Sequence, residues 1–146
     1  STRIVDPAVG SGHFLVSSLN EMILIKSKLG ILADEKGNRL DEIEVSIAND
    51  ELIIGDLKTK GFFEYTLTPD HQVLPYVQKI QQVIFNEKKK LIEQCLFGVD
   101  INPNSVRICQ LRLWIELLKH AYYKPESNYK ELETLPNIDI NIKCGN

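Results

Sequence analysis

Asp6-Pro7-Ala8-Val9-Gly10-Ser11-Gly12 follows the short apolar run Ile4-Val5 and precedes an amphipathic stretch that begins at His13. This order predicts a strand, a glycine loop and a helix, a unit in which backbone atoms come close to a bound small molecule. The loop lacks the third glycine of the dinucleotide fingerprint G-x-G-x-x-G. The Asp6 carboxylate also disfavours a phosphate in the same pocket, because two negative charges would repel each other. The loop therefore predicts a cofactor with a positively charged centre.

The length and composition are those of one ordinary globular domain. The chain has 146 residues, a formal net charge of −3 and 43% hydrophobic residues. Such a charge excludes a strongly basic surface over the whole chain, so any DNA contact would be confined to one face or to another part of the protein. No apolar run is long enough to cross a membrane. Cys95, Cys109 and Cys144 fit neither a disulfide framework nor a metal site, and we predict reduced core cysteines in a cytoplasmic protein.

Hydrophobic periodicity predicts alternating strands and helices. In chain order these are a strand at 4–5, a helix at 12–29, a helix at 71–95, a strand at 96–100, a helix at 103–122 and a strand at 138–144. The alternation predicts an α/β fold with parallel strands and right-handed crossovers. The three strands are expected to lie side by side in the order 3-2-1, which is half of a doubly wound, Rossmann-like sheet.

The segment between the first and second core strands is expected to leave this sheet as an inserted α+β lobe, residues 30–95. Turns with glycine and the alternation of Phe63, Tyr65 and Leu67 indicate a small β-hairpin or an irregular insertion before the second helix. The run Lys88-Lys89-Lys90 within that helix is interpreted as a solvated face rather than a phosphate-contact patch.

Ligands of such sheets bind at the carboxyl ends of the strands, where three features of this chain are expected to meet. These are the loop at 6–12, the pair Asp100-Ile101 and the pair Gly145-Asn146. Asp100 could accept hydrogen bonds from ribose hydroxyls, or it could cap the next helix together with Asn102.

The other strand-end residues also have two readings each. Ile101 could lie flat against a purine or fill the core, and Asn146 could contact an adenine edge or simply be a chain end. Asp6 could accept hydrogen bonds from the Gly10–Gly12 amides. Its place before a proline keeps its backbone extended and leaves its carboxylate available to a ligand cation.

The sequence Asp-Pro-Ala-Val-Gly-Ser-Gly-His-Phe-Leu at 6–15 resembles motif I of S-adenosylmethionine-dependent N6-adenine DNA methyltransferases. Leu96-Phe97-Gly98-Val99-Asp100-Ile101-Asn102-Pro103, followed by Leu111-Arg112-Leu113-Trp114, is similar to their motif II strand and helix. The resemblance is strongest to type IIG restriction-modification enzymes, which join methyltransferase and endonuclease in one chain. The segment from 135 to 146 resembles the approach to motif III of that group.

The resemblance implies an S-adenosylmethionine site of the class I methyltransferase fold. The backbone around Ala8, Gly10, Ser11 and Gly12 would contact the methionine part of the cofactor, and Asp6 would lie near its ammonium group. A second set of residues would bind the nucleoside part: Asp100 at the ribose hydroxyls, Ile101 at the adenine and Asn146 near its exocyclic amine. The family often has Asp where this chain has Asn146.

The family's catalytic motif, Asn/Asp-Pro-Pro-Tyr/Phe, is absent from these 146 residues, and so is the segment that normally precedes motif I. Asn102-Pro103 is no substitute, because Asn104 follows it and a helix is predicted to begin there. We therefore assign no catalytic residue and no metal ligand to this chain. It is expected to be a partial methyltransferase domain that cannot methylate by itself, and double-stranded DNA would be a partner of the full-length protein.

Two other functions remain open from the residues alone. One is a non-catalytic S-adenosylmethionine-binding or assembly module, and Asn-Pro-Pro-Tyr in the following few dozen residues of the parent protein would count against it. The other is a nucleotide-dependent oxidoreductase, which would bind NADH in preference to S-adenosylmethionine. The glycine spacing and the position of Asp6 disfavour it.

Overall fold

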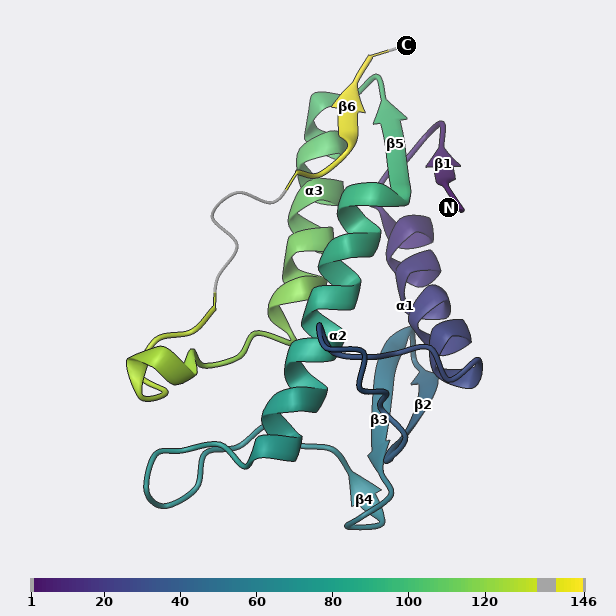
Figure 1. The fold of residues 1–146 in the computed structure, drawn as a ribbon. Helices are drawn as coiled ribbons and strands as arrows, with labels where there is room; N and C mark the ends of the chain where they lie inside the picture. Colours follow the sequence, from purple (N-terminus) through teal and green to yellow (C-terminus); the bar gives the residue numbers. More distant parts are fainter. Residues whose placement is uncertain (1, 134–138, 146) are drawn as a thin grey trace.

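The computed structural model describes residues 2–133 and 139–145. Its elements, in chain order, are β1 (Ile4–Asp6), α1 (His13–Lys28), β2 (Ile43–Ala48), β3 (Glu51–Asp56), β4 (Gly61–Phe62), α2 (Pro75–Gln94), β5 (Leu96–Asp100), α3 (Pro103–Leu118), the short 3-10 helix η1 (Pro125–Ser127) and β6 (Ile142–Cys144). Figure 1 shows β1, β5 and β6 at one end of the molecule and β2, β3 and β4 at the other.

The three core strands form one parallel sheet in the order β1-β5-β6. The expected parallel α/β half-sheet is therefore present. The three strands of this sheet are not consecutive in the chain, so the order is not simply 3-2-1. Strands β2, β3 and β4 lie between β1 and β5 in the sequence and form a second, antiparallel sheet. Residue 138 lies outside the described residues. The last strand was predicted at 138–144, but β6 begins only at Ile142, so Ile140 is not part of it.

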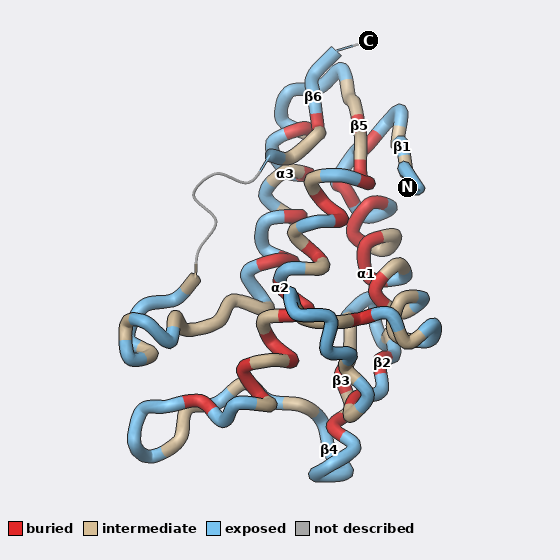
Figure 2. The backbone as a smooth tube through the Cα atoms, viewed as in Figure 1, coloured by how far each residue is buried: buried red, intermediate tan, exposed pale blue. Residues whose placement is uncertain are grey.

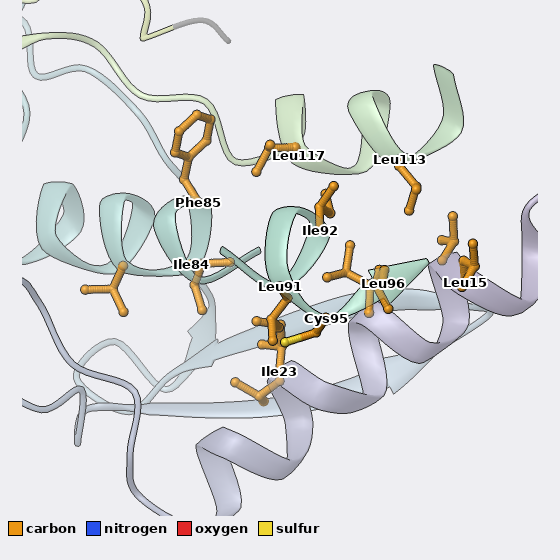
Figure 3. Packing of buried hydrophobic residues seen from close by; sticks show 14 of the residues in the cluster. Leu15, Ile23, Ile84, Phe85, Leu91, Ile92, Cys95, Leu96, Leu113 and Leu117 are labelled. Atoms are coloured by element: carbon orange, nitrogen blue, oxygen red, sulfur yellow. The ribbon is translucent and has the colours of Figure 1, made fainter. Parts of the chain in front are cut away.

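The three helices pack against one another and against one face of this sheet. Register places Leu96, Gly98 and Ile142 on the covered face, and all three are buried. Val5 points to the other face and is 64% exposed. Figure 2 shows the buried positions along the helices, and Figure 3 shows their packed side chains. The cluster in Figure 3 includes Leu15 and Ile23 of α1, Ile84, Phe85, Leu91 and Ile92 of α2, Leu96 of β5, and Leu113 and Leu117 of α3.

Gly98 allows β5 to lie close to the loop and helix that follow β1. A Cβ atom at this position would lie 2.3 Å from Cγ1 of Val9 and 3.2 Å from Cδ1 of Leu15. Both neighbours are almost fully buried, so neither can swing out into solvent.

Replacing Gly98 with alanine is therefore expected to lower the free energy of unfolding by about 1–3 kcal/mol through overpacking. Urea denaturation would measure the loss. Gly55→Ala is the matched control in β3, because its Cβ would make only an ordinary contact at 3.5 Å. A loss at Gly98 no larger than at Gly55 would contradict the steric explanation.

The insertion contains a hairpin that the sequence pattern did not locate. β2 and β3 pair across the two-residue turn Asn49-Asp50, whose φ angles are both positive. The strand expected around Phe63, Tyr65 and Leu67 is wrong, because β4 ends at Phe62. Tyr65 instead donates a hydrogen bond to Gln78 Oε1 and stacks against Tyr123. Tyr65 thus connects this segment to α2 and to Tyr123 rather than taking part in a strand.

Two predictions about burial need correction. Cys95 and Cys109 are buried and unpaired, as expected for core cysteines, but Cys144 is exposed at the end of β6. Lys88 is fully buried, whereas Lys89 and Lys90 fit the solvated face that was predicted for the whole run. Within the described residues, no helix is both long and apolar enough to cross a membrane.

Candidate functional site

The glycine loop turns sharply at the carboxyl end of β1. Asp6 ends that strand, and its carboxylate accepts a hydrogen bond from the Ala8 amide at 3.0 Å. It does not bind the Gly10–Gly12 amides, so this alternative is wrong. Gly10 and Gly12 have φ angles of 52° and 83°, the left-handed region that favours glycine. Gly12 donates to the Val9 carbonyl at 2.8 Å, which closes the turn immediately before α1.

Asp100 connects this loop to the end of β5. One carboxylate oxygen, Oδ2, accepts a hydrogen bond from the Gly10 amide at 3.0 Å, across 90 residues of sequence. The other, Oδ1, accepts from the Asn102 amide at 2.9 Å. These amides, with Asn102 contributing most, lower the pKa of Asp100 below its usual value of 3.8. The side chain is therefore an ionised acceptor at neutral pH, and each oxygen still has a lone pair for a ligand hydroxyl.

The end of β6 meets the same edge of the sheet. The Gly145 amide donates to the Asp100 carbonyl at 3.0 Å. Among the described residues, a Cβ at Gly145 would have no neighbour within 4 Å. Asn146, the predicted contact of the adenine edge, lies outside the described residues. The structure thus brings together the loop, Asp100 and Gly145 at three adjacent strand ends.

The remaining predicted residues are accessible from this edge. Ile101 is 73% exposed, which excludes a core role within the described part of the chain and leaves its side chain available to a flat ring. Ala8 and Ser11 are also exposed. Asn102 is the N-cap of α3, and its side chain accepts a hydrogen bond from the Asn104 amide. The alternative in which Asp100 and Asn102 together cap this helix therefore applies to Asn102, whereas Asp100 also binds the glycine loop.

Sequence reasoning missed two residues of α3 that lie against the loop. A Cβ at Gly12 would come within 2.9 Å of Cys109 Sγ and 3.1 Å of Cys109 Cα. Arg112, three residues further along the same helix, donates to the Ser11 carbonyl at 3.3 Å. Cys109 was predicted only as a reduced core cysteine. A clue to Arg112 was its i,i+3 spacing from Cys109, which puts both residues on one helix face.

The electrostatics of the site suit a ligand that carries a positive charge and hydroxyl groups. Asp6 and Asp100 supply carboxylates at two neighbouring strand ends, while the loop backbone offers close approach between them. Burial, reinforced by the Asp6 carboxylate, raises the pKa of Cys109 to about 11. The thiol is therefore neutral at physiological pH and acts as a packing group, not as a nucleophile.

One comparison with known proteins supports the coarser part of the resemblance, a restriction-modification methyltransferase. No model of a known protein family matches the chain. No solved structure matches it either. A protein of Methanocaldococcus jannaschii, named as a candidate type II restriction enzyme and methyltransferase, is 31% identical to it over 144 residues. The match covers 99% of this chain but 8% of that protein. The chain is therefore similar over nearly its whole length to a small part of a much larger candidate restriction enzyme and methyltransferase.

Proposed function

We propose that the chain forms most of the S-adenosylmethionine-binding part of a DNA N6-adenine methyltransferase in a restriction-modification system. The observation that carries the proposal is the convergence of the glycine loop, Asp100 and Gly145 at three parallel strand ends, joined by the hydrogen bonds of Gly10 and Gly145 to Asp100. The name of the Methanocaldococcus jannaschii relative supports the same class of enzyme. The remaining parts of the enzyme would come from a longer protein.

The loop would bind the methionine part of the cofactor. Gly10 has no side chain and its Cβ position is open among the described residues, while Gly12 lets the loop lie close to α3. The backbone of Ala8, Gly10, Ser11 and Gly12 could therefore lie against the ligand. The Asp6 carboxylate would attract the ammonium group. Its hydrogen bond to Ala8 uses one oxygen and leaves the second available.

The ends of β5 and β6 would bind the nucleoside part. Asp100 would accept hydrogen bonds from the ribose hydroxyls, as acids at this place in dinucleotide-binding sheets do. The exposed side chain of Ile101 would cover one face of the adenine. Asn146 would meet the exocyclic amine, a role that rests on the family resemblance alone.

The bound cofactor supplies an electrophilic sulfonium methyl group. The residues of this chain would orient the methyl donor so that the amino group of a target adenine can attack in line, and catalysis would rest on positioning and electrostatics. The adenine would be flipped out of double-stranded DNA to reach the site. The residues that receive it are those of the Asn-Pro-Pro-Tyr motif, which these 146 residues do not contain.

Calorimetric titration with S-adenosylmethionine tests the proposal. We expect the chain to bind the cofactor weakly and the Asp100→Ala variant to lose about 10-fold or more in affinity, because a charged acceptor of hydroxyl groups is removed. Asp70→Ala is the matched control, since Asp70 is an exposed aspartate in a turn away from the sheet. Equal affinity in the wild type and Asp100→Ala would remove the ribose role, and preferential binding of NADH would favour the oxidoreductase.

A methyl-transfer assay separates the enzyme from a non-catalytic cofactor-binding module. The chain alone should transfer no methyl group to duplex DNA, because it lacks the catalytic motif. A longer parent protein that contains Asn-Pro-Pro-Tyr should methylate adenine, and its failure to do so would support the non-catalytic alternative. Methylation by the 146-residue chain itself would contradict our assignment of the catalytic residues to another segment.

A further inference from the structure

We propose that Arg112 is a positioning residue of the glycine loop, and that it acts on cofactor binding by holding the Ser11 carbonyl. Its Nη1 donates to that oxygen at 3.3 Å, from a helix that lies 101 residues later in the sequence. The consequence for S-adenosylmethionine rests on the proposed function. The effect of Arg112 on the position of the loop does not depend on that function.

The rest of the loop is attached to β5 rather than to α3. The Val9 amide donates to the Val99 carbonyl at 3.1 Å, and the Gly10 amide donates to Asp100. These bonds fix the first half of the turn. The second half is closed by the Gly12 amide, which donates to the Val9 carbonyl, and Arg112 adds the side-chain hydrogen bond to the Ser11 carbonyl that ties this half to α3.

Cys109 limits the movement of the loop from the opposite direction. It is fully buried, and the near contact of its Sγ and Cα with the Cβ position of Gly12 shows that the loop already rests on α3. Arg112 prevents the loop from lifting away, and Cys109 prevents it from sinking further. Together they define one position of the Gly10-Ser11-Gly12 backbone, which is the part expected to lie against the methionine moiety.

Charges of both signs surround Arg112. The residue lines a cleft of about 250 Å³ between α1, the β2–β3 turn and α3. Asp50, Glu51 and Glu116 also line the cleft, and Lys119 lies beside them and pairs with both glutamates. The charged hydrogen bond to the Ser11 carbonyl, rather than the local potential, is therefore the interaction through which Arg112 acts on the loop.

Two measurements on the same variants test the proposal. Without ligand, hydrogen exchange of the Gly10 and Gly12 amides should be faster in Arg112→Gln than in the wild type, because the loop can lift. With S-adenosylmethionine, the same variant should bind about 10-fold more weakly, the order expected for one lost charged hydrogen bond. Arg112→Lys should recover part of both effects, since an ammonium still carries the charge and can donate one hydrogen bond.

Arg107→Gln is the matched control, because Arg107 is an exposed arginine on the same helix and its loss makes the same change in charge. Unchanged exchange and affinity in Arg112→Gln would overturn the proposal, as would an equal effect of Arg107→Gln. If Arg112→Gln fails to fold, Arg112→Lys decides: faster exchange and weaker affinity than in the wild type support the role, and wild-type values of both overturn it. If the wild type binds no S-adenosylmethionine, the proposed function fails, while the exchange measurement still decides the role of Arg112.

Discussion

The Gly12→Ala variant is expected to lose about 2–5 kcal/mol of the free energy of unfolding, of which about 1–2 comes from a left-handed backbone in a residue with a Cβ and about 1–3 from overpacking. The φ angle of Gly12 is 83°, and its Cβ would lie 3.1 Å from the backbone Cα of Cys109. A helix backbone cannot give way as a side-chain terminus can. Urea denaturation followed by circular dichroism would measure the loss.

Gly10→Ala is the control for Gly12→Ala. Gly10 shares the left-handed conformation, with φ at 52°, but a Cβ there would have no neighbour within 4 Å in the described part of the chain. It should therefore show only the backbone cost, about 1–2 kcal/mol. Adding Cys109→Ala to Gly12→Ala removes the sulfur and should make the double variant less unstable than the sum of the two single losses. Equal losses at Gly10 and Gly12 would contradict the steric part of the explanation.

The parts of the fold that the sequence predicted well are those with strong local signals. Asn102 before Pro103 marks the start of α3, and its side chain indeed accepts from the Asn104 amide at 2.9 Å. Gly30 marks the end of α1, where it adopts a φ of 66° and the Ile31 amide donates a hydrogen bond to the Lys26 carbonyl. The β1–loop–α1 unit was predicted from the same kind of local evidence.

The candidate site was predicted from topology rather than from any single residue. Once the strands are parallel and adjacent, the loop, Asp100 and Gly145 must meet at one edge. The hydrogen bond between Gly10 and Asp100 and the contact of α3 with the loop depend on the final packing distance of helix and sheet. Hydrophobic periodicity predicts which face of a helix is buried, but it does not predict the distance between the helix and the sheet. The contact of Arg112 with the loop was missed for this reason.

A β-hairpin was one of the two alternatives expected in this lobe, but its position was missed because its turn uses Asn49-Asp50 in place of a sequence with glycine. Asparagine and aspartate tolerate the left-handed conformation, but they are a weaker hairpin signal than Asn-Gly. The burial of Lys88 was missed for another reason. The residue follows Ile84 by one helical turn and so lies on the buried stripe of α2, but the neighbouring lysines suggested a solvated face.

Buried Lys88 belongs to a charged cluster between α2 and the end of α3. Its Nζ lies 3.0 Å from His120 Nε2 and 3.5 Å from Glu116 Oε2. Burial lowers the pKa of Lys88 to about 8, although Glu116 opposes this shift. Burial, aided by the charges of Lys88 and Lys119, lowers the pKa of His120 well below 6.5, so its neutral ring accepts the hydrogen bond from the lysine. Glu116 also binds Lys119 at 2.6 Å and is the carboxylate shared by both lysines.

This cluster gives the stability a defined pH dependence. The folded protein releases the Lys88 proton near pH 8, whereas the unfolded chain keeps it until about pH 10.5. The unfolded state therefore binds more protons in that window, and the contribution of Lys88 to stability rises as the pH increases from 8 to 10.5. Cys109 acts in the opposite direction between about pH 9 and 11, because its raised pKa keeps the proton on in the folded state. The free energy of unfolding would be measured against pH for the wild type and for Lys88→Met. The difference between the two curves gives the contribution of Lys88, because Cys109 contributes equally to both.

The Glu116→Gln variant is expected to lose about 3–5 kcal/mol at pH 7, because it leaves a buried ammonium without its carboxylate. The pKa of Lys88 should fall further, so the rise of stability should begin below pH 8, and part of the loss should be regained in alkaline solution. Urea denaturation at a series of pH values would show both effects. Adding Lys88→Met should restore most of the loss at pH 7, since removing both charges leaves neither one unpaired. An unchanged pH profile in Glu116→Gln would show that Lys119, and not Lys88, is the energetically important partner of this carboxylate.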